Sequence, residues 1–161
     1  MLPNCVAIRV ARKCPVVANA SGVAATYAAR VLCTMGADVM LIEDEDGSPL
    51  RREQPFLPSD DSDAPQVSAL FAYLSAGMAS ITIDLSVDRA QLNEMLRSTD
   101  IFIDDTAVDA RQALGLDEAR IASDFPDIVH VSVLPFGAHG AKAGWTGEDV
   151  VIQHAGGEGN L

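Results

Sequence analysis

Two segments of the chain carry the clearest pattern of apolar and polar positions. Over residues 25–35 apolar side chains recur with helical spacing, and Gly36 suits the left-handed conformation that often follows a last helical turn. Residues 39–42 then form a continuous apolar run, which is typical of a strand covered on both faces. Residues 80–85 alternate between apolar and polar side chains. The pattern therefore predicts a helix that leads directly into a buried strand, and a second strand further along the chain.

The same signals predict the remaining elements. Asn19 or Ser21 is expected to cap the first helix, because either side chain can accept a hydrogen bond from its free N–H groups. Residues 44–65 and 135–144 are rich in turn-forming residues and are expected to be loops. Further strands are expected at 6–10, 101–103 and 128–133, and helices over about 22–35, 66–75, 87–98, 107–113, 117–123 and 147–155.

Alternation of strands and helices at this spacing indicates an α/β fold. We expect one Rossmann-like, three-layer domain over residues 1–161, with helices on both faces of a mainly parallel sheet of about five strands. The residues expected in its core are Leu32, Val39, Leu41, Phe71, Ile81, Ile83, Phe102 and Val131.

Composition narrows the functional classes. A chain of 161 residues with 48% hydrophobic residues can bury a core, and its net charge of −12 argues against nucleic acid as a partner. The three cysteines are odd in number and lack CxxC spacing, so free thiols in a reducing compartment are expected. No apolar run approaches the roughly 18 residues that span a bilayer, and basic residues interrupt the N-terminal segment. A cytoplasmic protein without membrane contact is the resulting expectation.

Common catalytic and metal-binding motifs are missing from the sequence. It contains no GxGxxG, P-loop, GxSxG or HExxH motif. His130 falls in a predicted strand and is interpreted as a core or surface histidine. His139 and His154 have no neighbouring Cys or His at ligand spacing, so no metal site is expected.

Two pairs of acidic residues remain as candidates for chemistry. Asp104 and Asp105 follow a predicted strand at the end where open α/β sheets hold ligands, although helix-capping or solvated acids are the commoner reading. Glu148 and Asp149 can in principle do acid–base work, because neighbouring carboxylates shift each other's pKa. They equally suit the start of a helix, so they are weak catalytic candidates.

Five blocks in sequence order resemble the family III CoA-transferases, the group that includes formyl-CoA transferase and alpha-methylacyl-CoA racemase. The family pattern GPFAAMLLADLGADVVKVE matches residues 25–43, and NRxKRSVTLDLK matches 75–86. The patterns ADVVVENFRPGxxxxLGL, NPRLVYxSxSGFG and PGYDLxxQAxSG match 99–116, 125–137 and 146–156. The resemblance implies the N-terminal part of a protein that transfers CoA between an acyl-CoA and a carboxylic acid.

Most positions that the resemblance assigns to CoA contacts are substituted. The family's phosphate-binding cation after the second strand is Asp44 here, and the lysine after the third strand is Ser86. An Asn-Phe pair is replaced by Asp105 and Thr106, and a basic residue by Ala113. The CoA-contact positions implied by the resemblance are Val23, Ala24, Asp44, Ile83, Ser86, Asp105, Thr106, Ala113 and Leu114.

The family's nucleophilic aspartate lies beyond residue 161 in this pattern, so no catalytic nucleophile is expected within the chain. Two hypotheses follow. The chain is either the N-terminal portion of a transferase or racemase, or a degenerate structural or regulatory subunit that supports an active partner; the lost phosphate contacts favour the second. We expect a homo- or hetero-oligomer with a CoA-transferase-like chain, with CoA or acyl-CoA as the family's substrate but not tightly bound.

Overall fold

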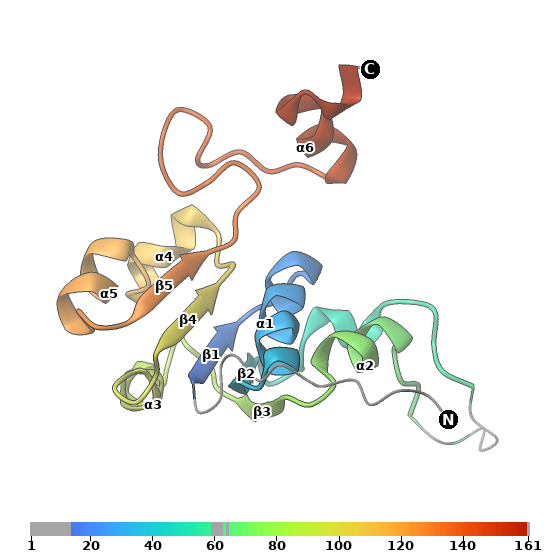
Figure 1. Ribbon diagram of the computed structural model, residues 1–161, viewed down its shortest axis with the longest axis horizontal. Coiled ribbons are helices and arrows are strands. Elements are labelled where there is room, and N and C mark those ends of the chain that lie inside the picture. The colour runs from blue at the N-terminus through green and yellow to red at the C-terminus, as the bar shows by residue number, and fades with distance from the viewer. Residues whose placement is uncertain (1–13, 59–62, 64, 161) are drawn as a thin grey trace.

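The computed structural model describes residues 14–58, 63 and 65–160, and in them five parallel strands form one sheet of order β3-β2-β1-β4-β5 (Figure 1). The strands are β1 (Pro15–Asn19), β2 (Asp38–Glu43), β3 (Ala79–Thr82), β4 (Ile101–Asp104) and β5 (Val129–Ser132). The helices are α1 (Val23–Met35), α2 (Ala69–Ser75), α3 (Arg89–Leu96), α4 (Val108–Leu114), α5 (Glu118–Asp124) and α6 (Asp149–Gly156). The expected α/β class with a parallel sheet is confirmed.

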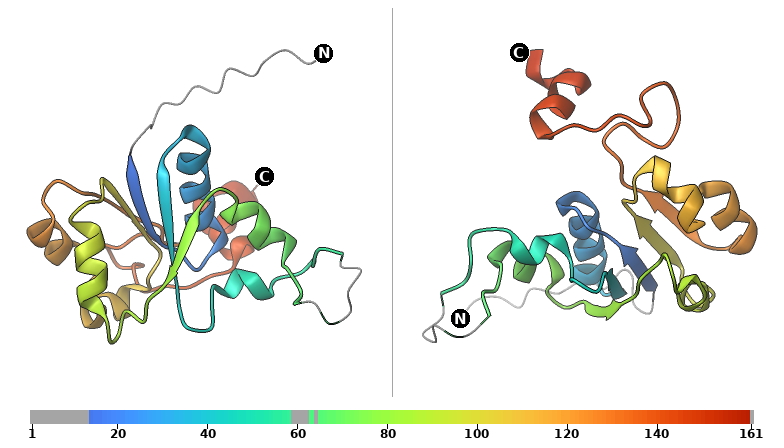
Figure 2. Two further views of the ribbon diagram at one scale, coloured as in Figure 1. Left: turned by 90° about the horizontal axis from the view of Figure 1, so that it is seen from below. Right: turned by 180° about the vertical axis from the view of Figure 1, so that it is seen from behind.

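Two apolar clusters pack on opposite faces of the sheet, which makes the domain three-layered (Figure 2). Successive residues of a strand point to opposite faces, so Val16 joins the cluster with α1 and α2, while Val17 joins the cluster with α3 and α5. In β4, Ile103 likewise joins the cluster with α1 and α2, and Phe102 joins the cluster with α3 and α5. Because β1 and β4 lie at the centre of the sheet, both faces of these strands are buried.

The central strand β1 was not among the expected elements. The strand expected at 6–10 lies outside the described residues, while β1 covers Pro15–Asn19. Its apolar run of four residues begins with proline and ends with alanine, and both residue types are uncommon in strands, so its strand signal is weaker than that of β2. Asn19 ends this strand rather than capping α1, whose N-cap residue is Gly22 with no side-chain cap.

The end of α1 follows the sequence prediction closely. Gly36 adopts φ 104°, and its N–H and that of Ala37 return to the carbonyls of Cys33 and Leu32. A left-handed residue at this point is strained for any side chain but glycine. The turn delivers the chain into β2 within two residues, which is why helix and strand appear as one continuous block in the sequence.

Five of the eight expected core residues are buried and three are not. Leu32 and Ile81 are only partly buried beside the two clusters, while Val131 is 37% exposed. Placing Val131 in the core was wrong because β5 is an edge strand, and no described helix covers its α1-side face. The confirmed core residues are Val39, Leu41, Phe71, Ile83 and Phe102.

The segment 44–65 contains more structure than the expected loop. Its described part holds a 3-10 turn, η1 (Pro49–Arg52), which buries Leu50, and Ser48 caps this turn by accepting from the Leu50 N–H. A second short turn, η2 (Glu158–Asn160), follows α6. Across residues 14–58, 63 and 65–160, the helices lack the combination of length and apolar character needed to cross a bilayer.

Candidate functional site

The strand order of the sheet reverses between β1 and β4, and their C-terminal ends lie side by side. Asn19 at the end of β1 is paired with Asp104 at the end of β4. From this point β2 and β3 extend to one side and β5 to the other. Open α/β sheets bind ligands in the crevice formed outside such a reversal. This edge is therefore the candidate site.

The carboxylate of Asp105 accepts hydrogen bonds from the backbone amides at the start of α1. Its oxygens accept from the Ser21 N–H at 2.9 and 3.0 Å and from the Gly22 N–H at 2.6 Å, and the Ser21 hydroxyl donates at 3.2 Å. A Cβ added to Gly22 would lie 3.2 Å from Asp105 Oδ2, so a side chain there would crowd this contact. Free N–H groups at a helix N-terminus favour an anion. Here an internal carboxylate supplies it.

Burial governs the ionisation of this carboxylate. Desolvation raises the pKa of Asp105 and the nearby Asp104 charge adds to the effect, while the hydrogen bonds from Ser21 and Gly22 oppose it. Asp105 was expected to be a ligand group or a helix cap. It caps α1, a helix more than 80 positions earlier in the chain, rather than the helix that follows it.

Asp104 points away from solvent into a polar cluster below the edge. It is fully buried, and its Oδ1 accepts from Asn19 Nδ2 at 3.1 Å and from the Thr106 hydroxyl and N–H at 2.6 and 3.0 Å. Its Oδ2 lies 3.1 Å from Nη2 of Arg111. Arg111 is itself 3% exposed and also donates to the Ser132 hydroxyl. This arginine is thus committed to an internal ion pair.

His130 completes this cluster from β5. Its ring stacks on Phe102 with centroids 5.2 Å apart, and its Nε2 lies 3.8 Å from Asp104 Oδ2, beyond hydrogen-bond distance. Burial alone raises the pKa of Asp104, but the His130 ring, the Thr106 donors and the Arg111 charge outweigh it and lower that pKa. Of the two expected environments, core or surface, the 11% side-chain exposure of His130 fits the core, although its Nε2 has no hydrogen-bond partner there.

A second group of charges lies at the ends of β2 and β3. Glu43 is buried and accepts from Arg51 through Nε at 2.6 Å and Nη2 at 2.7 Å, and from the Ser48 N–H at 2.9 Å. These contacts, with Arg51 the largest, lower the pKa of Glu43 to about 2. Arg51 also lies over the Phe71 ring at 4.1 Å. The cation nearest the end of β2 is therefore held by a carboxylate of the protein.

The opening beside these strand ends is acidic. A shallow pocket of about 310 Å³ is lined by Asp44, Glu45, Asp46 and Asp84. Ser86 donates to Asp84 through its N–H and hydroxyl, which lowers the pKa of Asp84. The lowered pKa of Asp84 favours its charged form. The acidic lining therefore repels anions. Within the described residues, no group of three or more His, Cys, Asp or Glu side chains could hold a metal ion.

The structure brings only some of the positions implied by the resemblance together. Asp105 lies against the start of α1, close in sequence to the exposed Val23 and Ala24, whereas the Thr106 hydroxyl accepts from Asn19 at the end of β1. Asp44, the buried Ile83 and Ser86 lie at the neighbouring ends of β2 and β3. The remaining two positions belong to the last turn of α4, where Ala113 is exposed and Leu114 packs beside the core.

The weak catalytic candidates Glu148 and Asp149 lie apart from this edge. They are exposed at the start of α6, which stands away from the sheet in Figure 1. Glu148 makes no side-chain cap to the helix. Two other candidates have local partners: His139 Nε2 lies 2.6 Å from Glu118, and His154 Nδ1 lies 2.7 Å from the Val150 carbonyl.

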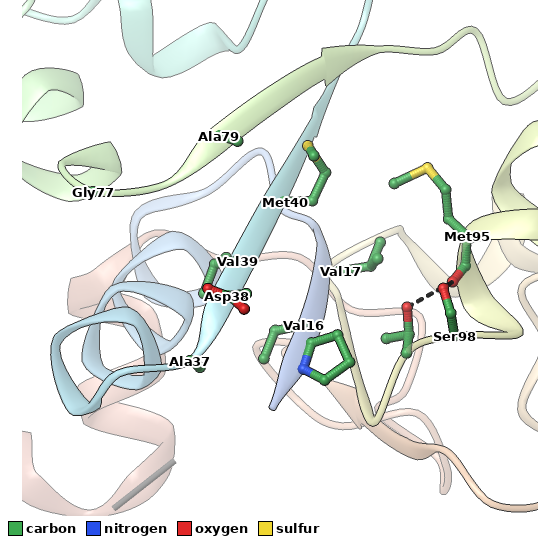
Figure 3. Close-up of a pocket in the computed structure, with 12 residues that line it drawn as sticks. Val16, Val17, Ala37, Asp38, Val39, Met40, Gly77, Ala79, Met95 and Ser98 are labelled. Carbon is green, nitrogen blue, oxygen red and sulfur yellow. Dashed lines mark hydrogen bonds between the residues drawn. The ribbon is translucent and has the colours of Figure 1, made fainter. Parts of the chain in front are cut away.

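A larger cavity opens at the opposite edge of the sheet, as Figure 3 shows. Its volume is about 370 Å³, and it is lined by the first residues of the strands and by apolar side chains such as Val17, Met40 and Met95. Parallel sheets place their ligand-binding loops at the other edge, and Asp38 is the one ionisable residue in its lining. This cavity is therefore not taken as the candidate site.

The sequence is similar to known proteins along nearly all its length. The sequence model of the family described as CoA-transferase family III matches residues 13–159. The succinyl-CoA:(R)-benzylsuccinate CoA-transferase subunit BbsE of Thauera aromatica is 28% identical over 136 residues, which are 83% of this chain and 33% of that one. A formyl-CoA:oxalate CoA-transferase of Streptomyces avermitilis is 30% identical over 81% of this chain and 31% of its own length. The chain thus spans about a third of the curated relatives that it matches.

Solved structures of similar proteins have the same fold as this chain. A CAIB/BAIF family protein from Brucella suis superposes with a TM-score of 0.82 at 27% identity, covering 92% of this chain and 39% of that one. Rv3272 from Mycobacterium tuberculosis has a TM-score of 0.79 at 23% identity, with 92% and 41% covered. The latter similarity concerns the fold alone.

Proposed function

The chain belongs to CoA-transferase family III, and from that premise we propose that it is a non-catalytic domain of the family that does not bind CoA tightly and supports catalysis carried out elsewhere. The observation that carries the proposal is the Asp105 carboxylate in the amide groups of Ser21 and Gly22. An anionic group of a ligand would have to displace this internal anion. In addition, Asp44 and Asp84 place negative charge at the neighbouring strand ends.

CoA is a multiply charged anion, and its tight binding requires cations or free amide groups. Arg111 is bound to Asp104, and Arg51 is bound to Glu43. A charge-assisted hydrogen bond contributes about 1.5–3 kcal/mol, so losing three or four weakens affinity by several orders of magnitude, although such losses are not strictly additive. Substituting carboxylates for cations adds repulsion to that loss.

Catalysis also requires a nucleophile in reach of the thioester. Family members, by resemblance, use an aspartate that follows the matched region, and Glu148 and Asp149 stand apart from the sheet edge (Figure 1). The second candidate function, the N-terminal portion of a complete transferase or racemase, is favoured by the one-third coverage of the relatives. In that case the nucleophile comes from further polypeptide.

An acyl-exchange assay tests whether the chain alone is catalytic. The purified chain is incubated with succinyl-CoA, the donor named for the Thauera aromatica relative, and an acceptor carboxylate, and the thioesters formed are quantified by chromatography. We expect no transfer by the chain alone. Transfer above the uncatalysed rate would overturn the non-catalytic proposal. A longer family member whose rate of transfer rises when this chain is added would support a partner role.

A further inference from the structure

Arg89, the first residue of α3, carries a guanidinium group whose inner nitrogens are shielded from solvent without a counter-ion. Its Nε and Nη1 have no hydrogen-bond partner, and only Nη2 is used, donating to the Gly115 carbonyl at 2.8 Å. No carboxylate within the described residues forms an ion pair with it, although four other arginines have such a partner. A guanidinium group stays charged, and buried charges are normally paired. Arg89 therefore has donors that no described group satisfies.

A second guanidinium group lies beside these donors. Gly115, the left-handed residue after α4, has no side chain, and a Cβ built there would lie 3.4 Å from Arg89 Nε and 3.3 Å from Arg120 Nη1. Two cations therefore meet over this glycine. Burial lowers the pKa of Arg89, and the Arg120 charge adds to the effect. Like charges in this arrangement repel each other, and an anion in contact with both removes the repulsion.

The carboxylates of this neighbourhood are engaged elsewhere. The charges of Asp104, Asp117 and Asp124 oppose the lowering of the Arg89 pKa. Asp104 is paired with the buried arginine of α4, and Asp117 caps α5 by accepting from the Arg120 N–H. Asp124 lies 3.6 Å from Arg120 Nε, and both of these side chains are exposed. None of these three carboxylates is bonded to Arg89.

Asn93, one helical turn after Arg89, has a further polar group without a partner. Its Oδ1 is also shielded from solvent and accepts no hydrogen bond. The two ends of an asparagine amide have nearly the same shape, so turning the amide by half a rotation presents its NH₂ group instead. In that orientation α3 presents donors from two side chains on one side of the helix, as an anion requires.

We propose that Arg89 and Arg120 bind inorganic phosphate, a small tetrahedral oxyanion, at the junction of α3, α4 and α5, with Asn93 turned to donate to it. The planar fork of a guanidinium group matches the spacing of phosphate oxygens. A free ion is favoured over a phosphate ester because the inner nitrogens of Arg89 are shielded. The ion enters when the exposed Arg120 side chain turns outward, and once bound it links α3 to α5.

This phosphate site is distinct from the positions that the resemblance assigns to CoA contacts. Its three donor side chains, Arg89, Asn93 and Arg120, are not among those positions, and two of them belong to α3. The inference therefore does not depend on whether the chain binds CoA.

The test is a titration of the whole chain with inorganic phosphate at pH 7.5, with chloride at the same ionic strength as the reference. The line width of the phosphate ³¹P resonance gives the dissociation constant, and thermal unfolding gives the effect on the fold. An ion that binds only the folded chain raises the unfolding midpoint as its concentration increases. We expect line broadening and a rising midpoint in phosphate, and no such rise in chloride. Equal effects of the two ions would overturn the proposal.

Matched variants locate the ion. Arg120→Gln should weaken phosphate binding by about tenfold, because one charged donor is lost. Asp124→Asn should strengthen it, because Arg120 loses a competing partner. Arg97→Gln is the control, since Arg97 is an exposed arginine of α3 paired with Glu94. A loss of binding in Arg97→Gln as large as that in Arg120→Gln would show diffuse attraction to the surface and overturn the site.

The variant Arg89→Met separates phosphate binding from a purely structural role. Its unfolding midpoint should not rise with phosphate, whereas the parent gains stability under the same conditions. A midpoint that rises with phosphate as much as in the parent would overturn the assignment of Arg89, and Arg120→Gln carries the test if Arg89→Met does not fold. Displacement of phosphate by an equal concentration of CoA would overturn the assignment to a free ion.

Discussion

At the scale of single residues, the edge of the sheet is notable for how many of its charges are already bound. Asp105 accepts hydrogen bonds from backbone amides at the start of α1. Asp104 forms an ion pair with Arg111, and Glu43 forms one with Arg51. The residue types at these positions could be read from the sequence. Their pairing could not, because Asp105 and Ser21 are 84 positions apart and only the β1–β4 pairing brings them together.

Removing the Asp105 carboxylate should weaken the fold. We expect Asp105→Ala to lower the free energy of unfolding by about 0.5–2 kcal/mol, the cost of losing a helix N-cap. Urea denaturation followed by circular dichroism measures the change, with Asp127→Ala in an exposed loop as the matched control. Equal midpoints for the parent and Asp105→Ala would show that the cap contributes nothing.

The Glu43–Arg51 pair should make stability depend on pH. Because the folded-state pKa of Glu43 is lowered from 4.5 to about 2, its contribution is present above pH 4.5 and is lost as pH falls toward 2. Arg51→Gln removes the main cause of that shift. The variant should therefore have a lower free energy of unfolding than the parent at neutral pH, and this difference should shrink on acidification. Arg52→Gln, which loses only a contact to the Asp46 carbonyl, should show no such trend in urea denaturation at pH 7, 5 and 3. A deficit that stays constant across this range would contradict the assignment.

At the scale of elements, the sequence was most informative where hydrophobic periodicity alone determines the structure. Helix α1 and strand β2 follow from apolar spacing and Gly36. Strand β1 was missed because Pro15 and Ala18 weaken the strand signal of a five-residue segment, Pro15–Asn19, that is buried by its neighbours in the sheet. Val131 was wrongly expected in the core because the apolar pattern of residues 128–133 suits a buried strand. Burial of such a strand also depends on whether a helix covers it, which the pattern does not show.

The two apolar clusters should act independently, since the sheet separates them. Ile103→Val on the α1 side and Ile121→Val on the α5 side should each cost about 0.5–1.5 kcal/mol. The sum of the two losses in free energy of unfolding should match the loss in the double variant within about 0.5 kcal/mol, as expected for sites without shared partners. Urea denaturation of the four proteins in the cycle measures this. A larger coupling energy would show that the clusters are not separate.

At the scale of the whole molecule, the fold of CoA-transferase family III is retained while its ligand edge carries internal acids. The chain covers about a third of its curated relatives, and no described helix covers the α1 side of β5. We propose that the chain differs from its family in the electrostatics at the strand ends and not in the architecture.

Isothermal titration of CoA into the purified chain at low ionic strength tests the central claim most directly. We predict no saturable heat up to about 1 mM CoA, a limit that corresponds to a binding free energy of about −4 kcal/mol. Asp105→Asn, which reduces the internal negative charge at the start of α1, should bind no worse than the parent and is the variant in which weak binding should first appear. Saturable binding of CoA to the parent chain with a micromolar dissociation constant would contradict the account.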